Sequence, residues 1–143
     1  MEFIKEYLDF VIFGLLGFMG FMALWVTIER ILYYKAFSIE RYTQTEILEI
    51  DLTRNLTILS IIGANAPFVG LLGTVVGVLI AFYDIGQNQN IDTSAVMIGL
   101  ALALKATAAG IAIAIPAIIA YNGLQRKVDV LTATHTAFLK RDR

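Results

Sequence analysis

One lysine stands inside a long apolar stretch, LALALKATAA at residues 100–109. Lys105 is the only charged residue between Ser94 and Tyr121. A charge near the middle of a bilayer costs roughly 2.5–3.5 kcal/mol or more, so such residues are usually functional. A buried lysine has to lose its proton, contact water or find an anion. The less functional interpretation is a neutral or water-solvated lysine between subunits.

Two threonine hydroxyls are the other candidates for chemistry within the apolar stretches. Counted from the outer ends of their predicted helices, Thr74 lies roughly 13 Å deep, Lys105 about 16 Å and Thr107 roughly 20 Å. The hydroxyls of Thr74 and Thr107 are placed to line one polar cavity. The alternative is that each hydroxyl bonds to a preceding carbonyl of its own helix.

The composition excludes several classes of function. The chain is 58% hydrophobic and 16% charged, which is the composition of a membrane protein. It has no cysteine, a single histidine and a net charge of -1, so neither a metal site nor a nucleic-acid surface is indicated. No nucleophile–base pair or phosphate loop is present, so we expect neither an enzyme nor a cofactor.

Three stretches are long and apolar enough to cross a bilayer as helices, namely 10–28, 58–83 and 94–121. They hold no Asp or Glu, so Lys105 needs either a water-filled cavity or a carboxylate from another polypeptide. Most Lys and Arg residues follow the first and third stretches, which predicts an outer N-terminus and a cytoplasmic C-terminus. We therefore expect an all-α membrane protein, with residues 1–9 as an interfacial helix and residues 29–57 and 122–143 cytoplasmic.

Small residues line the second and third spans at helical spacing. In lipid such faces mark close helix packing, and the third span has two of them, which implies a homo-oligomer. Pro67 and Pro116 interrupt these spans, either as functional bends or as tolerated kinks. In the cytoplasmic connection, Thr43 and Glu46 have the spacing of a helix capping box. Beyond the third span an apolar stripe continues as a long arm that includes His135, interpreted as a packed residue, with a pH role as the alternative.

Two motifs carry a resemblance to a known family. APFVGLLGTVVGV at 66–78, followed by GLALALKATAAGIAIAIPAIIAYN at 99–122, resembles the ExbB/TolQ/MotA proton-channel family, most closely its ExbB members. The resemblance implies one ExbB-like domain over residues 1–143 in a bacterial inner membrane. It also implies a homo-oligomeric ring, pentameric in ExbB, around an ExbD-like partner with an intramembrane aspartate. That partner and a TonB-like protein pass the work of proton flow to uptake across the outer membrane.

The resemblance also assigns residues. Thr74 and Thr107 match hydroxyls that border the pore near the partner's aspartate, which makes protons the transported ion. Gly70, Gly73, Pro67 and Pro116 match family features that shape the pore helices. Leu102 departs from the family, because many relatives have a glutamate there. Lys105 lies within about 60° of Leu102 around the helix and is placed to take over part of that position with inverted charge.

Two other functions remain open from the sequence. One is a TolQ-like role in envelope integrity within the same family. The other is a non-conducting membrane scaffold that clusters helices through its small-residue faces. Both would retain the three spans, but a scaffold would show no proton flux and no dependence on a partner aspartate.

Overall fold

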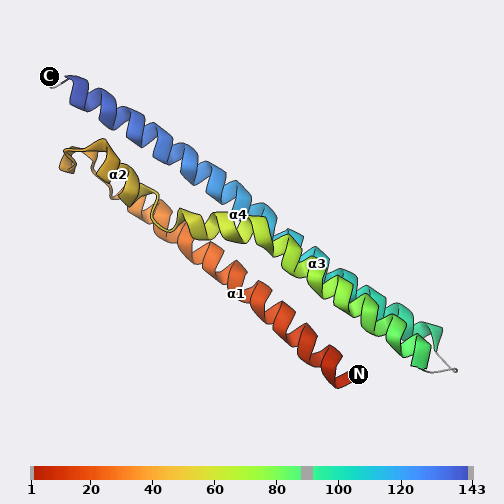
Figure 1. Ribbon diagram of the computed structural model, residues 1–143. Coiled ribbons are helices and arrows are strands. Elements are labelled where there is room, and N and C mark those ends of the chain that lie inside the picture. The colour runs from red at the N-terminus through yellow and green to blue at the C-terminus, as the bar shows by residue number, and fades with distance from the viewer. Residues whose placement is uncertain (1, 88–91, 142–143) are drawn as a thin grey trace.

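The computed structural model describes residues 2–87 and 92–141, and the regular elements within them are all helical. Three helices dominate Figure 1 and are each long and apolar enough to cross a membrane. Their bounds are Glu2–Lys35 for α1, Leu56–Gln87 for α3 and Thr93–Arg141 for α4. A short 3-10 helix, η1 (Ile39–Arg41), and α2 (Thr45–Leu52) lie between α1 and α3.

The N-terminal segment does not form a helix of its own. α1 continues without a break from Glu2 to Lys35, through the boundary expected near residue 9. No glycine or proline precedes Gly14, so nothing in this segment favours ending a helix. Residues 2–9 are therefore the first turns of the first long helix.

α3 and α4 form an antiparallel pair along most of the length of α3 (Figure 1). Small residues make this approach possible, because a Cβ added to Gly77 would lie 2.7 Å from the Cβ of Ala103. One of the two small faces of the third span is buried. So are these small residues of the second span, which form a ladder along α3: Gly63, Ala66, Gly70, Gly73, Gly77 and Ala81. The buried α4 members are Ala103, Ala106, Gly110, Ala114 and Ala117.

The second small face of α4 is not used within the chain. Ala101, Ala108 and Ala112 are all exposed. α1 packs on the α3–α4 pair through Ile12, Leu16 and Val26, and its aromatic residues Phe18, Phe21 and Trp25 point outward. A surface this apolar has to meet lipid or other protein chains.

The two proline residues lie inside helices that continue past them. α3 changes direction in its yellow-green first half in Figure 1, and Pro67 is the proline within this helix. Proline removes one backbone hydrogen bond and its ring clashes with the preceding turn, which bends a helix. α4 is a single helix from Thr93 to Arg141 with Pro116 inside it.

The C-terminal part of α4 is the long amphipathic arm that the apolar stripe predicts. Leu124, Val128 and His135 are buried, and the arm packs against α2. The predicted capping box is wrong: α2 begins after Gln44, which makes no side-chain cap bond. The side chain of Thr45 contacts His135 instead. α2 is separate from α3, because the chain turns between them at Asn55, whose φ is 68°.

Candidate functional site

The hydroxyls of Thr74 on α3 and Thr107 on α4 meet between the two helices. Their oxygen atoms are in hydrogen-bond contact, and both groups are partly buried. The Thr74 Oγ1 also lies 2.7 Å from the carbonyl oxygen of Ala103 on α4, and the Thr107 Oγ1 lies 3.4 Å from that of Gly70 on α3. The bonds therefore cross the helix interface, and the alternative of purely local bonding is wrong for this pair.

Each hydroxyl has one proton to donate, which limits how the pair is wired. The shortest bond to a carbonyl is from Thr74 to Ala103, so Thr74 donates there. Thr107 is then the donor to the Thr74 oxygen, with the Gly70 carbonyl as its weaker alternative. In this arrangement the Thr107 oxygen keeps a lone pair that no described residue uses. It is able to accept a hydrogen bond from a further group, such as a protonated carboxyl.

Gly70 and Gly73 bring the two helices close enough for this contact. A Cβ on Gly70 would overlap the carbonyl oxygen of Ala106 and lie 3.1 Å from the Cα of Thr107. A Cβ on Gly73 would lie 3.0 Å from both the Ala106 Cβ and the Ile12 Cγ2. These glycines are positioning residues for the threonine pair, since any side chain on Gly70 would push α4 away.

Lys105 does not join the threonine pair. It precedes Thr107 by two residues, about 200° around α4, so its exposed side chain lies on nearly the opposite side of the helix from Thr107. Leu102 and the unused small residues Ala101, Ala108 and Ala112 are exposed as well. Within the part of the chain that the structure describes, the one salt bridge joins Arg30 to Glu29, so Lys105 has no acidic partner there.

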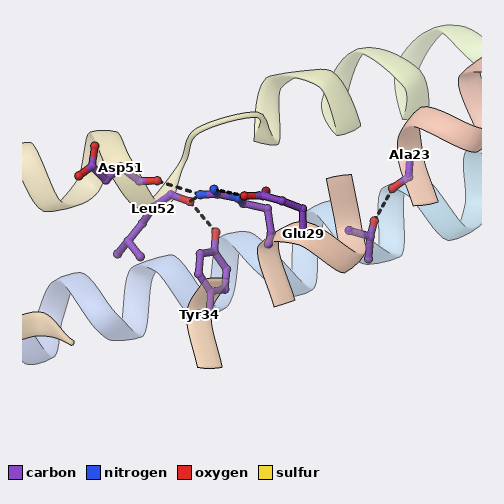
Figure 2. A network of polar contacts seen from close by, with 7 residues as sticks. Ala23, Glu29, Tyr34, Asp51 and Leu52 are labelled. Atoms are coloured by element: carbon purple, nitrogen blue, oxygen red, sulfur yellow. Dashed lines mark hydrogen bonds and ion pairs between the residues drawn. The ribbon is translucent and has the colours of Figure 1, made fainter. Parts of the chain in front are cut away.

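A polar cluster that the sequence reasoning missed lies at the end of α1. Arg30 is 2% exposed, and its guanidinium makes two bonds of 2.6 Å to the Glu29 carboxylate. It also donates to the Asp51 carbonyl oxygen at 2.8 Å, and the Tyr34 hydroxyl donates to that of Leu52 at 2.5 Å. Figure 2 shows Glu29 and Tyr34 of α1 facing Asp51 and Leu52 at the end of α2.

This cluster caps a helix. The last carbonyls of a helix have no partner within it, and a cation there also interacts well with the helix dipole. Arg30 therefore anchors α2 to α1 just past the first span. In the sequence, the ER pair at residues 29–30 directly after an apolar run was the one signal for this cluster. The other partners of Arg30 are backbone carbonyls, which a sequence does not identify.

His135 anchors the other side of α2. Its side chain is 0% exposed, and its Nε2 lies 2.8 Å from the Tyr42 carbonyl oxygen, so Nε2 carries the proton. Its Nδ1 lies 3.0 Å from the Thr45 hydroxyl, which donates to it in the neutral ring. The Tyr42 hydroxyl in turn donates to the Asp51 carboxylate at 2.5 Å, and this bond raises the pKa of Tyr42 above its ordinary value. His135 is packed and satisfied, as the stripe predicts.

The chain is similar to known proteins over almost its whole length. The family described as MotA/TolQ/ExbB proton channel family matches residues 26–136, well beyond the two motifs of the second and third spans. The biopolymer transport protein ExbB of Helicobacter pylori strain J99 is 51% identical over 132 residues, which cover 92% of this chain and 91% of that protein.

Two further relatives are also described as ExbB. The biopolymer transport protein ExbB of Aquifex aeolicus is 51% identical over 128 residues, covering 90% of this chain and 86% of that protein. That of Neisseria gonorrhoeae is 49% identical over 77 residues, 54% of this chain but 35% of that longer protein. A match of this length, together with three apolar helices and the contact between the two motif threonines, leaves one assignment. The chain is a multi-pass membrane protein that belongs to the MotA/TolQ/ExbB proton channel family.

Proposed function

We propose that the chain is a subunit of a proton-driven energy-transducing complex in a bacterial inner membrane. In this proposal several copies, five if the ring is like that of ExbB, surround an ExbD-like partner and power TonB-dependent uptake. The N-terminus faces the periplasm and the C-terminal arm lies in the cytoplasm. The names of the relatives support an ExbB-like role over a TolQ-like one, since all three compared proteins are described as ExbB.

The observation that carries this proposal is the hydroxyl pair of Thr74 and Thr107. Two apolar helices held together by glycine and alanine have no packing need for two mutually bonded hydroxyls. The unused lone pair of Thr107 is a suitable acceptor for a protonated partner aspartate. When that carboxyl has lost its proton, the Thr107 hydroxyl donates to it instead and releases Thr74. The proton is the transported ion, and no cofactor takes part.

Lys105 supports the need for a partner, because its exposed ammonium lies about 16 Å inside the apolar stretch. A charge facing lipid at this depth is costly, so another polypeptide or a water-filled space has to cover it. The exposed small residues nearest to it on the same face, Ala101 and Ala108, allow a second helix to approach closely. Pro67 and Pro116 would shape the two helices that border the pore.

Reconstitution tests the proposal directly. The chain is placed in lipid vesicles alone, with the ExbD-like protein of the same organism, and with that partner carrying aspartate to asparagine. An imposed pH gradient should drive proton entry only with the unaltered partner. Flux that is absent in all three preparations, from complexes that copurify intact, would favour the non-conducting scaffold. Co-expression with TolA-like instead of TonB-like proteins separates the TolQ-like role, because only the cognate partner should copurify.

A further inference from the structure

A hollow seam runs between α1 and the middle part of α4. The first hollow of this seam has a volume of about 350 Å³ and is lined mainly by apolar groups, among them Gly20, Leu24 and Pro116. A second hollow of about 260 Å³ lies between the same two helices and is lined by Ile31, Tyr34, Lys35, Leu124 and Lys127. The volume of the first hollow falls within the range of pockets that hold small molecules.

The two hollows are successive parts of one seam. Along α1 the lining residues recur every three or four positions, at Gly20, Leu24, Thr27, Ile31 and Lys35. Along α4 they do the same, at Ala112, Pro116, Ala120, Leu124 and Lys127. Such spacing keeps each row on a single helix face, so the seam leads from an apolar section to a basic end.

The basic end lies at headgroup depth. Lys35 and Lys127 follow the ends of their predicted spans by about 9–11 Å of helix, beyond the hydrocarbon and within reach of the polar layer. Both side chains are exposed, and neither forms a salt bridge with the described acidic side chains. Asp129 is the acidic residue nearest to Lys127 in sequence, and its carboxylate accepts a bond from Gln125. Two lysines from two helices therefore line the same hollow, at the end of an apolar seam.

We propose that this seam binds one anionic phospholipid of the leaflet at this end of the helices. An acyl chain lies in the apolar hollow, and the phosphate contacts Lys35 and Lys127. A single lipid supplies both parts in the required order, with its apolar tail toward the membrane interior and its negative headgroup at the membrane surface. Basic pockets between membrane helices are known to hold acidic headgroups. The proposal does not depend on the proton role of the threonine pair.

The test is a lipid titration on the full-length protein in detergent. Phosphatidylglycerol should raise the midpoint of thermal unfolding at lower concentration than phosphatidylcholine with the same acyl chains, and inorganic phosphate alone should have no effect. The double variant Lys35→Gln/Lys127→Gln should need about tenfold or more phosphatidylglycerol for the same rise, because two headgroup contacts are lost. The matched double variant Arg126→Gln/Lys140→Gln has the same net charge and should respond like the unaltered protein.

A second measurement covers the case in which the lysine variant does not fold. Native mass spectrometry of the unaltered protein should show phosphatidylglycerol retained in preference to phosphatidylcholine, and Ala112→Leu, which fills the apolar hollow, should reduce that retention. Equal retention of both lipids would overturn the proposal. So would a change in oligomer mass on Ala112→Leu with no change in bound lipid, since the seam would then be an interface between copies.

Discussion

The side-chain hydroxyls of Thr74 and Thr107 hydrogen-bond to each other across the α3–α4 interface, although 33 positions separate them in the sequence. Both sit in motifs shared with the proton channel family, and the glycine ladder of α3 brings them together. A bonded pair of hydroxyls is able to accept and donate in turn, which apolar side chains at these positions cannot do.

Thr107→Val should strongly reduce TonB-dependent uptake while the complex still copurifies. Valine keeps the shape of the side chain but removes the hydroxyl, so the partner carboxyl loses its acceptor. We expect proton flux to fall by about tenfold or more, the equivalent of one lost hydrogen bond in the barrier. Thr107→Ser should keep most of the flux. Thr134→Val is the matched control, since the Thr134 hydroxyl bonds to Val130 of its own helix. Unchanged uptake in Thr107→Val would refute the assigned role.

Lys105→Met should weaken capture of the ExbD-like partner. The substitution removes the exposed ammonium that would pair with a carboxylate of the partner, whereas the methionine side chain is compatible with lipid or with an apolar helix surface. An about tenfold weaker association is expected, measured as the amount of partner that copurifies at increasing detergent dilution. Lys105→Arg should restore the association, and Lys140→Met on the arm should have no effect. If all four proteins capture the partner equally, Lys105 is a solvated lysine between subunits.

Gly70→Ala should destabilise the helix pair and impair flux together. Its Cβ would overlap the backbone of α4 at Ala106, and forcing a methyl group into a packed contact costs about 1–3 kcal/mol. The measurement is the midpoint of thermal unfolding in detergent. Gly86→Ala on the same helix has nothing within 4 Å of the added Cβ and should leave the midpoint unchanged or higher. A similar response of the two variants would mean that the α3–α4 contact is looser than described.

Arg30→Met should release α2 from α1 without disturbing the spans. It removes a buried guanidinium that bonds to Glu29 and to the carbonyl of Asp51, and bonds of this kind are worth about 1.5–3 kcal/mol. Amide hydrogen exchange over Thr45–Leu52 should therefore accelerate by about 10- to 100-fold. Arg54→Met changes an exposed arginine with the same loss of charge and should exchange at the original rate. Equal exchange in both variants would show that Arg30 does not hold α2.

Much of the architecture could be read from the residues. The apolar runs gave three long helices, since burying their backbone in lipid leaves few alternatives to a helix. The heptad-like stripe through Leu124, Val128 and His135 predicted the packed arm correctly. Local signals near turns were less reliable: Thr43 and Glu46 have the spacing of a cap, yet α2 starts after Gln44 because Thr45 bonds to His135 across the fold.

The sequence by itself determined the membrane class, the family and the identity of the polar residues within the spans. Only the tertiary structure decided which of those residues meet. Helical spacing shows that Thr107 and Lys105 lie on different faces of α4, but it does not show which face packs on α3. That choice depends on the fit of Gly70, Gly73 and Gly77 against Ala103 and Ala106, a contact between distant segments. The same fit leaves Lys105 exposed, away from the threonine pair and without an ion pair to the acidic side chains that the structure describes.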